Sequence, residues 1–187
     1  TKEDVQLVFL GEGDRYYENL LQELAQRYPD KVSTTIAFNA VLAQRIYAGV
    51  DIFLMPSAFE PCGLGQLISM RYGTIPVVRS TGGLADTVYD YTTNPLYGNG
   101  FVFRELQPAA FLDAIRRALR VYREKPQAWR ELVTRVMLQD FSWAKSGASY
   151  VELYQKALAK KARSISHYPV EPLMEPSAAP APENAYS

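Results

Sequence analysis

The sequence contains very little cysteine and histidine. Cys62 is the only cysteine and His167 the only histidine among 187 residues. One cysteine excludes an intrachain disulfide, and one histidine excludes both a histidine metal cluster and a His-based catalytic triad in the core. Any reaction that this chain supports must therefore use carboxylates and backbone groups.

The chain also lacks an excess of charge of either sign, and it lacks a long hydrophobic run. Its 20 Lys and Arg residues balance 20 Asp and Glu residues, so nothing favours nucleic acid or an anionic membrane as a partner. No apolar run approaches the roughly 18 residues that a membrane span needs, and no basic and apolar leader opens the sequence. We therefore expect a soluble protein in a reducing compartment.

Hydrophobic residues make up 48% of the chain, which is enough for one core of ordinary size. Short apolar runs alternate with stripes of helical spacing, and this predicts a Rossmann-like α/β fold with a parallel sheet and helices on both faces. The predicted strands are Val5–Leu10, Lys31–Ala37, Ile52–Met55, Ile75–Val78 and Phe101–Phe103. We expect the first, third and fourth of them to be buried.

From Pro108 the pattern is helical almost to the end of the chain. Pro108 suits a first helical turn, and Pro126 separates this helix from a second one. A final helix of about residues 147–163 is expected to bury an apolar face made of Tyr150, Leu153, Tyr154 and Leu158. We predict one domain, residues 1–163, followed by a proline-rich disordered tail, residues 164–187.

Local signals predict a helix cap, a loop and a turn. Asn39 could cap the helix that follows it, and the polar segment Tyr89–Gly100 indicates a long surface loop. The sequence Gly11-x-Gly13 resembles the start of a dinucleotide-binding fingerprint. Because Tyr16 occupies the place of the third glycine, where the helix would need a small residue, we interpret this segment as a plain turn.

The stretch Asp51–Val88 contains two strand–loop–helix units in succession. The first loop carries a carboxylate, Glu60, and the second carries the pair Gly82-Gly83, whose backbone can approach a phosphate closely. In parallel α/β sheets both loops open at the carboxyl edge of the strands, where ligands bind. The pairing suggests a nucleotide-linked substrate.

Each of these residues also has a plain structural explanation. Glu60 could be a solvated loop residue, and the segment Thr81–Gly83 could be only a turn with a helix cap. Phe38, at the end of a predicted strand, could belong to the core. We expect Cys62 to be a small buried hydrophobic residue with an unreactive thiol.

Three blocks of this region resemble the starch and glycogen synthases. They are Phe59-Glu60-Pro61-Cys62-Gly63-Leu64-x-Gln66-Leu67, then Met70-Arg71-Tyr72-Gly73-Thr74, and then Ser80-Thr81-Gly82-Gly83-Leu84-x-Asp86-Thr87-Val88. The spacing between the blocks also fits, and the similarity extends from about Val5 to the final helix. A match of this length is far more specific than any single glycine motif.

The resemblance implies a GT-B glycosyltransferase, in which two Rossmann-like domains face a cleft and the carboxyl-terminal one holds most of the donor nucleotide. This chain resembles most of that second domain, from its second strand onward. The resemblance therefore implies that the domain's first strand, with its phosphate-binding Arg and Lys, and the amino-terminal acceptor domain lie outside this chain. We expect this chain alone to be inactive.

The family moves glucose from ADP-glucose, or UDP-glucose in some members, to the non-reducing end of an α-1,4-glucan with retention of configuration, and the resemblance implies no metal or cofactor. Such transfers need hydrogen-bond donors near the phosphates of the nucleotide and a carboxylate near the sugar ring. The resemblance implies that Glu60 is that carboxylate and that Cys62 and Gly63 touch sugar hydroxyls. It implies that Leu64 and Gly65 begin the helix whose amide protons face the phosphates. It also implies that Phe38 stacks on the base and that the second loop of the site consists of Thr81, Gly82 and Gly83.

Four positions depart from the family pattern and leave the donor preference open. Ile68 stands where related transferases carry a second Glu, and Gly65 stands where many members have Thr. Ala58 and Gln44 replace a frequent Arg and a frequent His. Two alternatives follow: a non-catalytic nucleotide- or glucan-binding module, or a GT-B enzyme with another acceptor, such as a sucrose-type synthase. The expected location is a bacterial cytoplasm or a plastid stroma.

Overall fold

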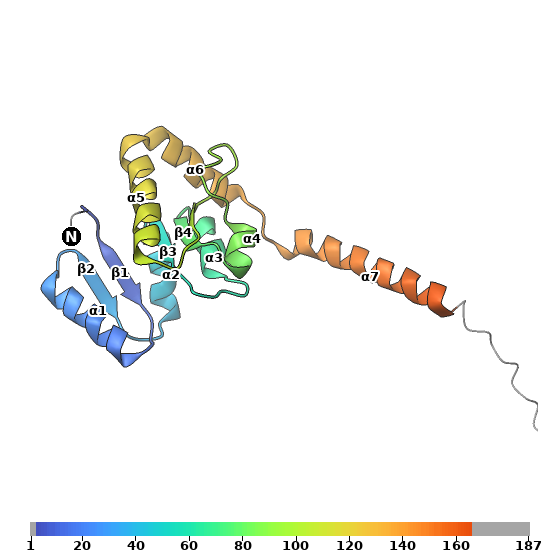
Figure 1. The fold of residues 1–187 in the computed structure, drawn as a ribbon, viewed down its shortest axis with the longest axis horizontal. Coiled ribbons are helices and arrows are strands. Elements are labelled where there is room, and N and C mark those ends of the chain that lie inside the picture. The colour runs from blue at the N-terminus through green and yellow to red at the C-terminus, as the bar shows by residue number, and fades with distance from the viewer. Residues whose placement is uncertain (1–2, 166–187) are drawn as a thin grey trace, which may run out of the picture. The chain divides into compact units, whose positions relative to one another are not determined.

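The computed structural model describes residues 3–165 (Figure 1). The chain divides into two compact units, Thr1–Gln139 and Asp140–Ser187. Among the described elements, the first unit contains all the strands and the first six helices. No helix within residues 3–165 is long and apolar enough to cross a membrane.

Parallel strands and helices alternate through the first unit. The strands are β1 (Leu7–Leu10), β2 (Val32–Thr35), β3 (Ile52–Met55), β4 (Ile75–Arg79) and β5 (Phe101–Phe103). The helices are α1 (Arg15–Arg27), α2 (Ala40–Gly49), α3 (Gly65–Arg71), α4 (Gly82–Thr87), α5 (Pro108–Glu124) and α6 (Pro126–Leu138). β1 pairs with β2, and β3, β4 and β5 form a second sheet in that order, with every pair parallel. The predicted parallel α/β fold is confirmed, with strand ends shifted by one or two residues.

The helix starts follow local rules. Asn39 precedes α2 and accepts a hydrogen bond from the Leu42 amide at 2.9 Å, so the predicted cap is confirmed. Pro108 and Pro126 begin α5 and α6, where a missing amide proton leaves no hydrogen bond unmade. Thr81 occupies the cap position of α4, but its side chain makes no capping hydrogen bond.

Strand β4 forms the centre of the core. Its residues Ile75, Val77 and Val78 are fully buried because β3 and β5 flank it. Ile75 and Val77 belong to a large apolar cluster with Phe101 of β5 and Leu132 of α6, whereas Val78 belongs to a second, smaller cluster. Successive residues of β4 therefore supply apolar side chains to both faces of the sheet.

Strands β1 and β3 are less buried than their apolar sequences predict. Every residue of β3 is only partly buried, and Val8 of β1 is 46% exposed. The prediction that both strands are buried is therefore wrong for this chain. In the described part of the chain each of them has a strand neighbour on one edge alone, which is β2 for β1 and β4 for β3.

The segment Tyr89–Gly100 agrees only in part with the predicted surface loop. Leu96 and Tyr97 at its tip are exposed, as expected. Asn99 near its end is fully buried, and its side-chain amide donates to the Thr87 carbonyl oxygen at 2.9 Å. A buried amide that is hydrogen-bonded fixes the base of this segment to the end of α4.

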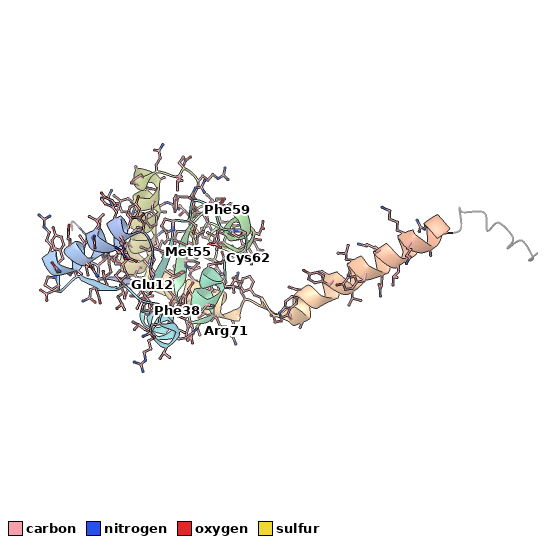
Figure 2. The ribbon with its side chains drawn as sticks, turned by 90° about the horizontal axis from the view of Figure 1, so that it is seen from below. Glu12, Phe38, Met55, Phe59, Cys62 and Arg71 are labelled. Carbon is pink, nitrogen blue, oxygen red and sulfur yellow. The ribbon has the colours of Figure 1, made fainter. Side chains whose placement is uncertain are left out.

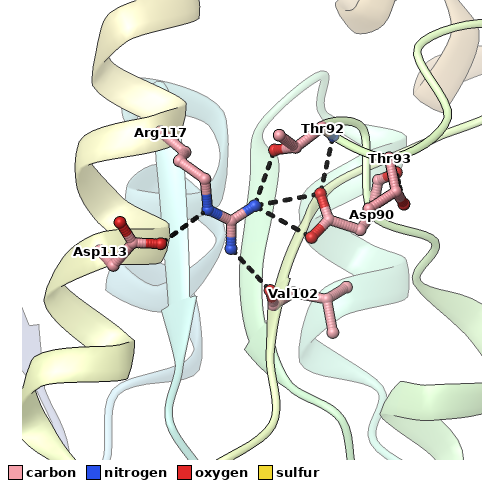
Figure 3. Close-up of polar contacts among 6 residues, drawn as sticks. All are labelled: Asp90, Thr92, Thr93, Val102, Asp113 and Arg117. Carbon is pink, nitrogen blue, oxygen red and sulfur yellow. Dashed lines mark hydrogen bonds and ion pairs between the residues drawn. The ribbon is translucent and has the colours of Figure 1, made fainter.

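A polar network holds the other end of the same segment to α5 (Figure 3). The Arg117 guanidinium donates to both oxygens of Asp90, at 3.1 and 2.9 Å, and to the Thr92 hydroxyl at 2.7 Å. It also donates to the Val102 carbonyl oxygen of β5 at 2.7 Å. The side chains of Arg117 and Asp90 are only 19% and 18% exposed, so water competes only weakly for these charge-assisted hydrogen bonds.

Helix α7 (Trp143–Ile165) is the only described element of the second unit. The apolar residues that were expected to be buried, Tyr150, Leu153, Tyr154 and Leu158, are 49–68% exposed, so that prediction is wrong. An apolar stripe becomes buried only against another element, and this unit offers none among the described residues. Most of the predicted disordered tail, residues 166–187, lies outside the described residues, and residues 164 and 165 end α7.

Candidate functional site

The candidate site consists of the β3–α3 loop, residues 56–64, and the turn from β4 into α4 at residues 80–83. The two segments are in direct contact, because the Gly83 amide donates to the Glu60 carbonyl oxygen at 3.1 Å. A Cβ atom added at Gly82 would overlap that same oxygen, and one added at Gly83 would overlap the Cys62 carbonyl oxygen. Only glycine fits at both positions, and Gly82 also has a positive φ of 45°.

The side chains of Gln66 and Thr87 connect these two segments through hydrogen bonds. Gln66 of α3 is fully buried, and its amide donates to the Gly63 carbonyl oxygen at 2.9 Å and to the Thr87 hydroxyl at 3.1 Å. The Thr87 hydroxyl in turn donates to the Gly83 carbonyl oxygen at 2.6 Å. One chain of hydrogen bonds therefore connects the loop after β3 to the turn after β4.

Arg79 holds the start of the β3–α3 loop. It ends β4, and its guanidinium donates to the Ala58 carbonyl oxygen at 2.7 Å and to the Ser57 carbonyl oxygen at 3.4 Å. It also donates to the Arg104 carbonyl oxygen, just after β5, at 3.2 Å. This one side chain links the loops that follow β3 and β5, on either side of β4.

The structure brings most of the predicted site residues together. Glu60 is half-buried, Gly63 is buried with a positive φ of 75°, and Leu64 is exposed at the start of α3. Figure 2 shows Met55, Phe59 and Cys62 along the same part of the molecule, where β3 ends and its loop begins. The predicted site residues of the two segments that are in direct contact are Glu60, Cys62, Gly82 and Gly83.

Cys62 corrects one expectation. The residue was expected to be buried, but its side chain is exposed. It lies in the loop between β3 and α3, where its carbonyl oxygen faces the α4 turn and the Gln66 amide. The backbone of this position is therefore held in place while its side chain faces solvent.

Phe38 and Gly65 lie at the margins of the site. Phe38 follows β2 and is 86% exposed, so it is not a core residue. No hydrogen bond or ring contact among the described residues joins it to the two segments. Gly65 begins α3 with little room for a side chain, since an added Cβ would lie 3.0 Å from the Phe53 ring.

Sequence reasoning missed Arg79, Gln66 and Thr87 as residues that position the loops. Gln66 and Thr87 lie inside the matching blocks without an assigned role, and Arg79 directly follows the predicted strand Ile75–Val78. The position of Arg79 at the carboxyl end of β4 was the one signal available. In residues 3–165, no group of three or more His, Cys, Asp or Glu side chains that could hold a metal ion is found.

Comparisons with known proteins agree with this arrangement. The family described as glycosyl transferases group 1 matches residues 1–120. A glycogen synthase from Desulforudis audaxviator is 57% identical over 157 residues, which cover 84% of this chain and 31% of that protein. A glycogen synthase from Moorella thermoacetica is 56% identical over 160 residues, covering 86% of this chain and 33% of that protein. The chain thus spans about a third of the length of these relatives.

Solved structures show the same fold. The catalytic domain of starch synthase IV from Arabidopsis thaliana, bound to ADP and acarbose, matches with a TM-score of 0.74 and 30% identity over 84% of this chain and 39% of that one. A sucrose-phosphate synthase from Thermosynechococcus elongatus matches with a TM-score of 0.57 and 25% identity over 83% of this chain and 39% of that one.

Proposed function

The chain belongs to the glycosyl transferases group 1 family, and we propose that it is the donor-binding part of a glucan synthase. In this proposal it binds ADP-glucose and presents the glucose for retaining transfer to the non-reducing end of an α-1,4-glucan. The supporting relatives are glycogen synthases at 50–57% identity. The chain spans about a third of their length. We therefore also propose that a separate domain of the same protein, outside this chain, binds the acceptor.

The observation that carries the proposal is the contact between the β3–α3 loop and the α4 turn. Glycosyl transfer from a nucleotide sugar needs fixed hydrogen-bond donors near the leaving phosphates and a carboxylate near the sugar ring. The Gln66–Thr87 hydrogen bonds and the Gly83–Glu60 hydrogen bond hold the two segments in one arrangement. A pre-organised loop places a carboxylate without a cost in ordering at the moment of reaction.

We assign roles within this proposal by residue. Glu60 supplies the carboxylate that stabilises positive charge on the sugar ring, and Cys62 and Gly63 supply backbone groups to the sugar hydroxyls. Leu64 and Gly65 begin the helix whose amide protons face the phosphates. Thr81, Gly82 and Gly83 form the second wall of the site. Phe38 offers an exposed flat ring on which the base stacks.

The test is the substitution Glu60→Gln in the full polypeptide that contains this chain. Loss of the carboxylate removes charge stabilisation in the transition state, so we expect glucan elongation to fall by at least about 100-fold. Calorimetric titration should show ADP affinity within about threefold of the parent protein, because the carboxylate acts on the sugar and not on the nucleotide.

Glu105→Gln is the matched control, because this residue is exposed in the segment after β5 and has no role in the proposal. The control should elongate glucan at the parent rate. Unchanged elongation in Glu60→Gln would remove Glu60 from the mechanism. A parent protein that binds ADP but transfers no glucose would favour the alternative, a nucleotide-binding module that retains the fold.

Donor and acceptor are tested separately. Parallel titrations with ADP and UDP measure which base the site prefers. We expect a preference for ADP, because the matched starch synthase structure is bound to ADP. The similarity to a sucrose-phosphate synthase keeps a sugar-phosphate acceptor as the second candidate. Chromatography of the products distinguishes a lengthened glucan from a disaccharide phosphate.

A further inference from the structure

The segment that precedes Glu60 is held by one side chain. Within the described part of the chain, no backbone–backbone hydrogen bond is found for residues 56–59. The hydrogen bonds that these residues do make come from Arg79, whose Nη1 donates to the Ala58 carbonyl oxygen at 2.7 Å and to the Ser57 carbonyl oxygen at 3.4 Å. The position of this segment therefore depends on Arg79.

The Glu60 carboxylate depends on the backbone around it for its position. Among residues 3–165, no hydrogen bond or ion pair to this carboxylate is found. Pro61 follows Glu60, and a proline restricts the residue before it to extended backbone. The Glu60 carbonyl oxygen accepts from the Gly83 amide at 3.1 Å. The backbone of Glu60 is thus fixed from its carboxyl side by Pro61 and Gly83, and from its amino side by Arg79.

Arg79 is suited to this task because it is itself held in place. It ends β4, the central strand of its sheet, and the preceding residues Val77 and Val78 are fully buried. Its Nε also donates to the Arg104 carbonyl oxygen, just after β5, at 3.2 Å. A guanidinium is planar and presents its donors in a fixed fork. Arg79 therefore ties the loop before Glu60 to the two inner strands of the sheet.

The other anchors of the site do not involve Arg79. The Gln66 amide donates to the carbonyl oxygens of Gly63 and Cys62, at 2.9 and 3.4 Å. The Gly83 amide donates to the Glu60 carbonyl oxygen. Loss of the Arg79 guanidinium would release residues 56–59 and leave these other hydrogen bonds in place.

We propose that Arg79 is a positioning residue for glucosyl transfer, which sets the place of the Glu60 carboxylate by holding the Ala58 carbonyl oxygen. This inference rests on the proposed function, because it takes Glu60 as the carboxylate beside the sugar ring. A displacement of about 1 Å can reduce the rate of a positioned reaction about 100-fold. A change at Arg79 should therefore lower kcat and leave nucleotide binding intact.

The test is Arg79→Met in the full polypeptide that contains this chain. Methionine keeps an apolar stem of similar length and removes all three hydrogen bonds. We expect kcat for glucan elongation to fall about 10–100-fold. The KM for the nucleotide sugar and the Kd for ADP should stay within about threefold of the parent values, because the nucleotide contacts are unchanged.

Arg135→Met is the matched control. Arg135 is half-buried like Arg79, and its guanidinium also donates to two loop carbonyl oxygens, those of Pro95 and Gly98, at 2.9 and 2.6 Å. The loop that it holds has no role in the proposed site. Both substitutions should lower the temperature of thermal unfolding, but Arg135→Met should keep the parent kcat. Equal kcat values in the two variants would leave Arg79 a merely structural role and overturn the proposal.

A double variant tests whether Arg79 acts through Glu60. Once the carboxylate is gone its placement no longer matters, so Glu60→Gln combined with Arg79→Met should be no more than about threefold slower than Glu60→Gln alone. Multiplied effects would show that Arg79 acts on another group. A loss of ADP affinity of about tenfold or more in Arg79→Met would mean that Arg79 binds the nucleotide itself. Either result would overturn the positioning role.

Arg79→Lys replaces Arg79→Met if the methionine variant shows no cooperative thermal transition. Lysine keeps a cationic donor and lacks the fork that reaches three carbonyl oxygens, so kcat should fall by at least about threefold. The other criteria stay the same.

Failure of the proposed function would look different from failure of this inference. In the first case the parent protein would not elongate glucan, or Glu60→Gln would elongate it at the parent rate, and the role of Arg79 would fall with its premise. In the second case the parent protein and Glu60→Gln would behave as proposed, and the folded Arg79 variant would keep the parent kcat.

Discussion

At the scale of single residues, the contact between the two site segments depends on Gly83. Its φ is not in the left-handed region, so substitution tests the contact and not the backbone conformation. In Gly83→Ala the new methyl group would overlap the Cys62 carbonyl oxygen. We expect the free energy of unfolding to fall by about 1–3 kcal/mol, as overpacking does in cores. Urea denaturation monitored by circular dichroism measures this change.

Gly13→Ala is the control for this prediction, because an added Cβ at Gly13 meets no atom within 4 Å. We expect that variant to be unchanged or more stable by up to about 1 kcal/mol, since alanine reduces the entropy of the unfolded chain. If Gly83→Ala were as stable as Gly13→Ala, the close approach of the α4 turn to the β3–α3 loop would be refuted.

The same scale shows what the sequence could and could not reveal about the site. The pair Gly82-Gly83 could be recognised because a close backbone approach demands glycine whatever surrounds it. The role of Gln66 could not, because a buried amide has meaning only once the carbonyl oxygens around it are known. Cys62 was expected to be buried on its residue type alone, and its place in a loop decided otherwise.

At the scale of elements, Arg117 of α5 attaches the segment Tyr89–Gly100 to the sheet through Asp90, Thr92 and the Val102 carbonyl oxygen. In Arg117→Met the methionine keeps the apolar packing and loses all these donors, which leaves the partly buried Asp90 carboxylate without its cationic partner. We expect stability to fall by about 1–3 kcal/mol and amide exchange to accelerate in residues 90–98. Hydrogen exchange with mass spectrometry measures the second effect.

The neighbouring substitution Arg116→Met is the control. Arg116 is 49% exposed and pairs with Glu3, and exposed ion pairs contribute about 0–1 kcal/mol. Its exchange in residues 90–98 should match that of the parent chain. Equal effects of the two substitutions would mean that the network in Figure 3 contributes no more than a surface ion pair.

Elements were predicted well where the cause is local, and poorly where it is not. The strands, the Asn39 cap and the proline starts of α5 and α6 all follow from neighbouring residues. The burial of β1 and β3 does not, because it depends on whether a strand lies at each edge. An apolar sequence shows that a strand is suited to two neighbours, but it does not show that both are present.

At the scale of the whole molecule, the buried hydrophobic residues among the described ones extend from Val32 to Val136, and all of them belong to the first unit. We therefore predict that a chain ending at Ser142 unfolds cooperatively, with a free energy of unfolding within about 1 kcal/mol of the parent chain. Gln139 must be kept, since its side chain accepts a hydrogen bond from Asn99 at 2.9 Å.

A deeper truncation that ends at Lys125 provides the contrast, because it removes α6 with the buried side chains of Trp129, Leu132 and Val136. Full burial of one such side chain stabilises a fold by about 1.5–3 kcal/mol, so losing all three removes about 4.5–9 kcal/mol, which is comparable with the whole stability of a typical small domain. Thermal denaturation should show a cooperative transition for the chain ending at Ser142 and none for the chain ending at Lys125. A loss of several kcal/mol in the first truncation would mean that the stability of the first unit requires residues of the second.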